Sequence, residues 1–260
     1  MMAEGNSLRA TSRLCDVSIN TVTKLLVDVG QAVAEYQDKA LRGLNCRRIQ
    51  CDEIWAFCYS KQKNVPAEFQ GQFGYGDVWT WTALCADTKL VPSWAVGTRG
   101  AGTAFEFIQD LSERLANRVQ LTTDGHRVYL DAVESAFGSE IDYAMLVKLY
   151  GEDPKAESKY SPSECIGCRT QVISGNPKPK YISTSFVERQ NLTIRMGMRR
   201  FTRLTNGFSK KVENHIAAVA IHFMHYNFGR IHKTLRVTPA MAAGISDHIW
   251  SLEEIALLAN

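Results

Sequence analysis

The sequence predicts an α/β chain in which a mixed sheet, with elements in the order βββαβαβ-α, lies between a small helical region and a set of C-terminal helices. Three observations lead to this prediction. The 260 residues are 45% hydrophobic, which is enough to fill the core of one large domain or two modest ones. The middle of the chain alternates β-rich runs with stretches of helical periodicity. Both ends of the chain carry helical periodicity alone.

The first 45 residues predict two helices followed by a connecting helix or linker from Glu35 to Asn45. Asn6 or Ser7 can cap a first helix that reaches about Leu14, and Ser18 can cap a second helix after a short turn at 15–17. The apolar side chains of the second helix recur at helical spacing: Val22, Leu25, Leu26, Val29 and Val33. This pattern is typical of a helix-turn-helix, whose second helix enters a DNA groove. The residues that would face the DNA are Asn20, Thr21 and Lys24. An ordinary helical hairpin that packs on the next domain, or one that mediates dimerisation, fits the same pattern.

Residues 46–208 predict the sheet-containing domain. The predicted strands span residues 48–59, 78–86, 90–96, 119–123 and 141–149. The predicted helices span 103–117 and 126–138, with a further helix from about Ser185. Residues 151–183 are rich in Pro, Gly, Ser and Lys without a sustained period, so we expect a long loop or insertion there. Residues 209–260 predict one strongly apolar helix and then shorter ones.

The charge of the chain is more informative in its distribution than in its total. The net charge is only +3, yet seven basic residues and no acid lie between Arg189 and Lys211. Those residues are Arg189, Arg195, Arg199, Arg200, Arg203, Lys210 and Lys211. Such an asymmetry is typical of a phosphate-binding surface.

The sequence also bears on compartment and on thiol chemistry. No apolar run approaches the roughly 18 residues of a membrane span, and the N-terminus lacks the pattern of a signal peptide, so we expect a cytoplasmic protein with no membrane partner. Seven scattered cysteines favour reduced thiols. Cys165 and Cys168 have the spacing of half a structural zinc site, but no second pair of this spacing exists. Because such a site needs about four ligands, we expect ordinary loop thiols.

Three carboxylates stand where packing alone gives no reason for them. Asp52 lies inside the first β-rich run, Asp124 ends the apolar run at 119–123, and Glu188 lies in the most basic segment. Carboxylates that converge on one spot repel each other, and Mg²⁺ or Mn²⁺ would compensate that repulsion. Two such ions about 4 Å apart can activate a nucleophile and stabilise the leaving oxygen of a phosphodiester.

Alternatives to this assignment stay open on spacing alone. Glu53 could be the inward acid in place of Asp52, since neighbours on a strand point to opposite faces. Asp124 could be a turn aspartate before Gly125.

The helix expected around Glu188 places polar residues on one face. Asn191 and Arg195 follow Glu188 by three and seven residues, and Arg199 extends the same stripe. We expect Glu188 to face a metal ion while the arginines of this segment bind the backbone of a nucleic acid.

Four motifs together resemble the DDE-type transposases of bacterial insertion sequences. They are CDEIW around Asp52, TTDGHRVY around Asp124, FVERQNLTIR around Glu188, and YNFGRIHKTLRVTPA from Tyr226 to Ala240. The resemblance covers nearly the whole chain. It implies a ribonuclease H-like catalytic domain preceded by a helix-turn-helix.

The resemblance also implies a reaction and its participants. Cleavage frees a 3′-hydroxyl at the end of the element, and that hydroxyl attacks target DNA in line. Asp52, Asp124 and Glu188 would be the catalytic acids and would hold two Mg²⁺ or Mn²⁺ ions. Arg195 would contact DNA near the reacting phosphate, and His232 and Lys233 would touch DNA or support the site. The partners would be double-stranded DNA, as element ends and target, and further copies of the chain in a homo-oligomer.

Two other functions remain compatible with the sequence. One is a DNA-binding regulator with an inactive catalytic domain, although retention of all three acids weighs against it. The other is a metal-dependent nuclease of the same fold that only hydrolyses DNA.

Overall fold

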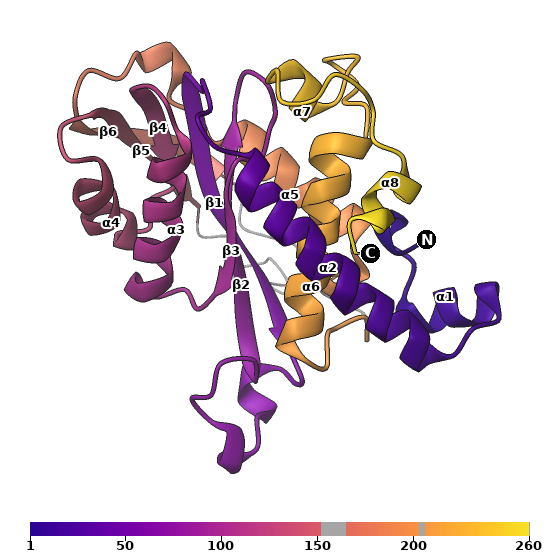
Figure 1. Cartoon of the computed structure of the whole chain (residues 1–260). Helices are drawn as coiled ribbons and strands as arrows, with labels where there is room; N and C mark the ends of the chain where they lie inside the picture. Colours follow the sequence, from indigo (N-terminus) through magenta and orange to yellow (C-terminus); the bar gives the residue numbers. More distant parts are fainter. Residues whose placement is uncertain (152–164, 203–205, 260) are drawn as a thin grey trace.

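The structure is a computed structural model that describes residues 1–151, 165–202 and 206–259. Within these residues the chain is an α/β protein with a six-stranded mixed sheet and eight α-helices (Figure 1). The predicted DNA contact Arg203 lies outside the described residues.

The sheet forms the centre of the molecule, with strand order β3-β2-β1-β4-β5-β6. The strands are β1 (Arg48–Cys58), β2 (Gly76–Cys85), β3 (Trp94–Gly97), β4 (Val119–Thr123), β5 (Ile141–Tyr150) and β6 (Cys165–Ser174). The first three strands pair antiparallel, whereas β4 is parallel to β1 and to β5. One helix lies between β3 and β4 in the chain and another between β4 and β5. Such crossover connections are needed because parallel strands cannot be joined by a tight turn.

Helices cover both faces of this sheet (Figure 1). On one face lie α3 (Ala101–Arg114) and α4 (Val128–Phe137), and on the other lie α5 (Ser185–Gly197) and α6 (Val212–Met224). A π-helical turn, His225–Gly229, continues α6, and two short helices follow: α7 (Pro239–Ala242) and α8 (Leu252–Leu257). The order βββαβαβ-α along the chain is therefore confirmed, apart from one added strand.

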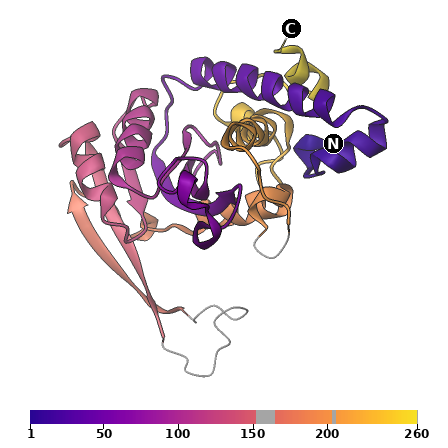
Figure 2. The same cartoon turned by 90° about the horizontal axis from the view of Figure 1, so that it is seen from below.

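That added strand corrects the expectation of a structureless segment at 151–183. Residues Cys165–Ser174 form β6, which pairs antiparallel with β5. None of the ten residues of β6 is buried and seven are exposed, so the strand has no alternation of buried and exposed residues to reveal it in the sequence. Cys165 and Cys168 accordingly lie exposed on a strand, not in a loop. Figure 2 shows the outer part of the β5–β6 hairpin projecting beyond the helices.

The strand expected at 90–96 is shorter than predicted, since β3 begins only at Trp94. Pro92 has no N–H group to donate to a neighbouring strand. The N–H and carbonyl of Val91 instead bond the side-chain amide of Asn227, at 3.0 and 2.9 Å.

The N-terminal helices begin at the predicted caps. The Ser7 hydroxyl accepts a hydrogen bond from the Ala10 N–H in front of α1 (Leu8–Cys15), and the Ser18 hydroxyl accepts one from the Asn20 N–H in front of α2 (Ile19–Ala40). Asp16 adopts a left-handed conformation, φ 51°, in the turn between them. The helix pair is therefore formed as predicted. The segment expected as a connecting helix or linker begins as helix, since α2 continues to Ala40.

Helix α2 packs closely on α6. Its stripe is buried at Val22, Leu26, Val29 and Val33, whereas the prediction was wrong for Leu25, which is 48% exposed. At Gly30 the helices are so close that an added Cβ would lie 2.5 Å from the Cβ of Ala217. The same close approach lets the Gln37 amide donate to the Ala220 carbonyl at 3.2 Å.

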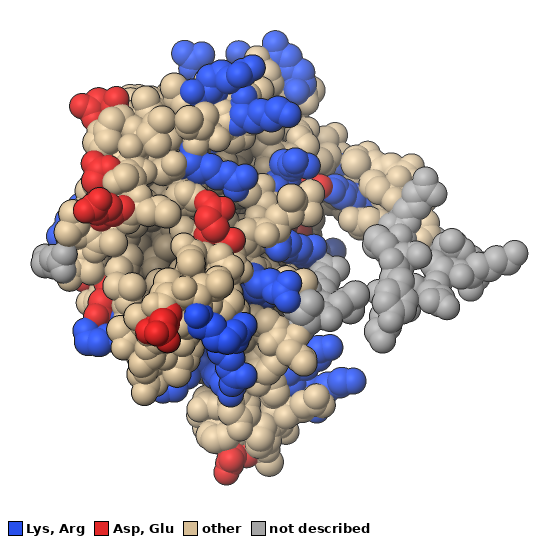
Figure 3. Space-filling model, turned by 90° about the vertical axis from the view of Figure 1, so that its right-hand side faces the viewer, with Lys and Arg blue, Asp and Glu red and all other residues tan. Residues whose placement is uncertain are grey.

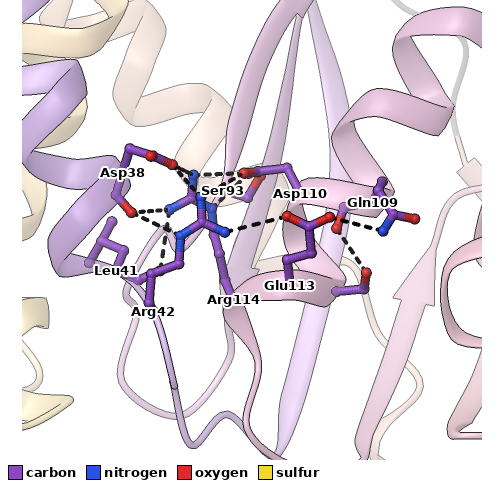
Figure 4. A network of polar contacts seen from close by, with 9 residues as sticks. Asp38, Leu41, Arg42, Ser93, Gln109, Asp110, Glu113 and Arg114 are labelled. Atoms are coloured by element: carbon purple, nitrogen blue, oxygen red, sulfur yellow. Dashed lines mark hydrogen bonds and ion pairs between the residues drawn. The ribbon is translucent and has the colours of Figure 1, made fainter.

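A charged network joins the end of α2 to α3 (Figure 4). The guanidinium of Arg114, 7% exposed, donates to Asp110 and to Asp38, each at 2.7 Å. It also donates to the Leu41 carbonyl at 3.2 Å, and Arg42 reaches Asp38 at 2.5 Å. Because Arg114 is nearly buried, these partners are what makes its charge tolerable there.

Every helix in the described part of the chain is too short or too polar to span a lipid bilayer.

Candidate active site

The site is built where β1 and β4 stop pairing. Their last parallel pair is Cys51 with Thr123, and the next residues of the two strands are Asp52 and Asp124. Parallel register therefore brings the two acids to the same edge of the sheet, at the carboxyl end of β4, where open α/β sheets hold ligands.

Glu53 joins these two acids. Among the described residues, Asp52, Glu53 and Asp124 each offer a carboxylate oxygen within 4.8 Å of the others, the one such group that could hold a metal ion. The Glu53 side chain is fully buried, and its Oε1 has no hydrogen-bond partner in the described structure. Its Oε2 lies 3.3 Å from the Nε of Arg99. Both neighbours on β1, rather than one of them, thus reach Asp124.

Backbone and amide groups orient the two aspartates. One oxygen of Asp52 accepts from the Glu53 N–H at 2.9 Å, and the other accepts from the Asn191 side-chain amide on α5 at 2.8 Å. An oxygen of Asp124 accepts from the His126 N–H at 2.9 Å. Asn191, which the helical spacing placed beside Glu188, therefore contacts the first acid of the site directly.

Glu188 lies in the same cavity but is not part of the carboxylate group. Its Oε2 lies 2.5 Å from the Nζ of Lys148 on β5, and its Oε1 accepts from the Thr184 hydroxyl. The Glu188 carboxylate is thus held by a cation and a hydroxyl at the entrance to α5.

The cavity that these residues share has a volume of about 600 Å³. All three predicted catalytic acids line it, together with Asn191 and Arg195. Residues that the sequence did not indicate also line it: Arg99, His126, Lys148 and Thr184. The cavity is therefore bounded by both acids and bases from α5, β1, β5 and the loops after β3 and β4.

Burial and crowding of the acids raise their pKa values. The pKa of Asp52 is raised to about 7, chiefly by burial and then by the charges of Asp124 and Glu53. The pKa of Glu53 is also raised to about 7, chiefly by burial and then by the Asp124 charge. The Tyr129 hydroxyl and the Arg99 guanidinium favour the charged carboxylate and so keep this pKa from rising further. Near neutral pH the pair is therefore poised to lose protons when a compensating positive charge arrives.

The donor set suits a hard divalent cation. All three groups are carboxylates, and Mg²⁺ and Ca²⁺ prefer oxygen ligands. Oxygens that share one Mg²⁺ lie about 3–4 Å apart, given metal–oxygen distances of about 2.0–2.1 Å, so the cluster needs only a modest contraction. The unpartnered Oε1 of Glu53 is the buried acceptor that such an ion would satisfy.

The predicted DNA-contacting residues outside the cavity lie on several elements. Asn20, Thr21 and Lys24 are exposed at the start of α2, where Lys24 pairs with Asp28. Arg189 and Arg199 are exposed, as is Lys233, while His232 is half-buried. Arg199 and Arg200 line a second cavity of about 1240 Å³ with Arg9 and Lys210. Figure 3 shows one face of the molecule on which many Lys and Arg side chains gather.

Two of the cavity residues that the sequence did not indicate lie far along the chain from their partners. Arg99 and Lys148 lie 46 and 40 residues from the acids they contact, Glu53 and Glu188, and no local pattern connects them. Glu53 was indicated in the sequence by its position next to Asp52. His126 follows Asp124 by two residues, but a lone histidine beside a turn is more often structural.

Models of protein families give no match to the chain, and a search of curated proteins finds no match either.

Proposed function

We propose that the protein is a DDE-type transposase that cuts and joins DNA with the help of divalent cations held by Asp52, Asp124 and Glu188. The observation that carries the proposal is the convergence of a first-strand acid, a fourth-strand acid and a helix acid on one cavity that also contains Asn191 and Arg195. The sheet is compatible with a ribonuclease H-like fold, since three antiparallel strands are followed by two parallel ones.

Each residue has a role that its contacts support. Asp52 is oriented by Asn191 and by the backbone N–H of Glu53, and Asp124 is oriented by the backbone N–H of His126. Both carboxylates are therefore ordered before a cation binds, and little conformational entropy is lost on binding. Glu53 adds a third oxygen donor to this group. Divalent cations bound there would supply activation of a water or 3′-hydroxyl nucleophile and stabilisation of the leaving oxygen.

The basic residues would position the DNA. Arg195 lines the cavity about two helical turns beyond Glu188, on the same face of α5. There it could bind a phosphate next to the reacting one. The exposed arginines of α5 and of the turn after it extend this positive surface away from the cavity.

Strand joining tests this proposal against simple hydrolysis. A labelled DNA end with a free 3′-hydroxyl, incubated with supercoiled plasmid and Mg²⁺ or Mn²⁺, should become covalently joined to the plasmid. Glu188→Gln should abolish joining and leave DNA binding largely intact, because it removes a metal-facing acid and no phosphate contact. The exposed acid Glu134 on α4 provides a matched control, Glu134→Gln. Cuts without any joined product would support a nuclease, and binding with neither would support a regulator.

A further inference from the structure

Lys148 forms an ion pair with Glu188 in the cavity, and the proposed reaction gives this lysine no role. Lys148 belongs to the part of β5 beyond its last pair with β4, Thr123 with Met145. Among the described residues this part of β5 pairs with β6 alone, and Lys148 lies opposite Cys168 in the register. The β5–β6 hairpin thus delivers an ammonium group to a cavity whose other charged walls come from β1, the loops after β3 and β4, and α5.

The contact competes directly with a metal ion for Glu188. One Glu188 oxygen lies 2.5 Å from the Lys148 ammonium, and the other accepts from Thr184. A divalent cation that binds this carboxylate would lie close to the ammonium and be repelled by it. The charges of Asp52 and Glu188 also act on each other across the cavity, so the ammonium stands close to the whole acid group.

The pair can open at small cost. The side chains of Lys148 and Glu188 are 31% and 36% exposed, and ion pairs with this much solvent access are weak. A divalent cation carries twice the charge and accepts several oxygens at once, so it can displace the ammonium from Glu188. Lys148 would then be left in the cavity without its carboxylate, facing the space that a DNA phosphate enters.

We propose that Lys148 is an exchange cation: it neutralises Glu188 while the site lacks metal, and it transfers to a DNA phosphate when a divalent cation takes Glu188. Lys148 is therefore a positioning residue for the DNA and a competitor of the metal. This inference rests on the proposed function for its second step, whereas its first step concerns metal binding alone.

Metal binding measured by calorimetry tests the first step without any reaction. Mn²⁺ would be titrated into the full chain and into Lys148→Met, which keeps an unbranched side chain without its charge. The dissociation constant should fall about two- to fivefold in the variant, the worth of a partly exposed ion pair. Lys148→Arg should bind Mn²⁺ as the wild type does. Lys39→Met, which removes an exposed lysine on α2, controls for the change in net charge.

A double-mutant cycle locates the effect. In a Glu188→Gln background, Lys148→Met should no longer tighten Mn²⁺ binding, because the competing pair is already gone. Unchanged or weaker Mn²⁺ binding by Lys148→Met, or equal tightening in both backgrounds, would overturn the inference.

Salt dependence of DNA binding tests the second step. In Ca²⁺, Lys148→Met should lower the slope of log affinity against log salt by about one contact, and in EDTA it should leave the slope unchanged. Equal slopes in Ca²⁺, or an equal loss in EDTA, would contradict the exchange. Tighter Mn²⁺ binding by the variant in a chain that never cuts or joins DNA would keep the first step and reject the proposed function. A wild-type chain that binds no Mn²⁺ would reject both.

Discussion

Replacing Asp52 with asparagine should stabilise the metal-free protein at alkaline pH. Asp52 is largely buried and is crowded by Asp124 and Glu53, and together these effects raise its pKa from 3.8 to about 7. One pKa unit is worth about 1.4 kcal/mol, so a rise of about three units corresponds to ~4 kcal/mol at most. Asp52 keeps partial access to solvent, which screens its charge, and we therefore expect about 2 kcal/mol.

The direction of the pH dependence follows from the raised pKa. The folded chain holds a proton on Asp52 that the unfolded chain releases above about pH 4, so this contribution to stability is present at low pH and is lost between about pH 4 and pH 7. Glu53, with a pKa raised to about 7, acts in the same direction. The free energy of unfolding of the wild type in EDTA should therefore fall as the pH rises from 5 to 8, and that of Asp52→Asn should fall less.

The variant should keep the hydrogen bonds of the site. The asparagine oxygen can accept from the Glu53 N–H as Asp52 does. The Oδ1 of Asn191 is a buried acceptor without a partner in the described structure, so turning the Asn191 amide over would let it accept from the new amide. No cavity and no lost hydrogen bond should offset the relief of repulsion.

Urea unfolding followed by tryptophan fluorescence at pH 5 and pH 8 in EDTA measures this effect, with Glu134→Gln as the control. Mg²⁺ at 100 times its dissociation constant for the wild type should add about 2.7 kcal/mol to the free energy of unfolding of the wild type. The same Mg²⁺ concentration should add less to that of Asp52→Asn, which lacks one of the ligands. If Asp52→Asn were less stable than the wild type at pH 8 in EDTA while Glu134→Gln were unchanged, burial and crowding would not destabilise the charged form of Asp52 as described.

Three further predictions concern the DNA surface and the fold. Arg195→Ala should weaken DNA binding at every sequence and lower its salt slope by about one, which binding titrations between 50 and 200 mM salt would measure; an unchanged slope would remove Arg195 from the phosphate contacts. Arg114→Ala should cost about 1–3 kcal/mol in urea unfolding, because it removes the hydrogen bonds to Asp110 and to the Leu41 carbonyl, while Asp38 keeps its pair with Arg42; an unchanged stability would contradict the network's role. Gly30→Val should lower the melting temperature, because even a Cβ would lie 2.5 Å from Ala217, and a variant as stable as the wild type would show that α2 can move away from α6.

Local signals predicted much of the fold. Ser7 and Ser18 were visible as caps, and the helix around Glu188 begins at Ser185 as its sequence indicates. Strand β4 was predicted at its observed bounds because it is a short run, rich in β-branched residues, that ends at the turn residues Asp124 and Gly125. Strand β6 was missed, since it is held by backbone pairing with β5 and buries almost no side chain.

The site was predictable only where neighbours in sequence carry the information. Asp52 and Asp124 come directly after Cys51 and Thr123, the last parallel pair of β1 and β4, and this pairing brings the two acids together. The contact of Glu188 with Lys148 depends on how far β5 extends past β4, which no spacing in the sequence reveals. The burial of Glu53 depends equally on the tertiary structure around it, including Arg99 and Tyr129.

Nicking of supercoiled plasmid is the measurement that tests the central claim most directly. Purified protein would be incubated with plasmid in Mg²⁺, Mn²⁺ or EDTA, beside Asp52→Asn, Glu188→Gln and the control Glu134→Gln. We predict nicking that requires a divalent cation, survives in the control and disappears in both site variants. Nicking that persists in Asp52→Asn and Glu188→Gln, or that proceeds in EDTA, would contradict a carboxylate-held metal site in this cavity.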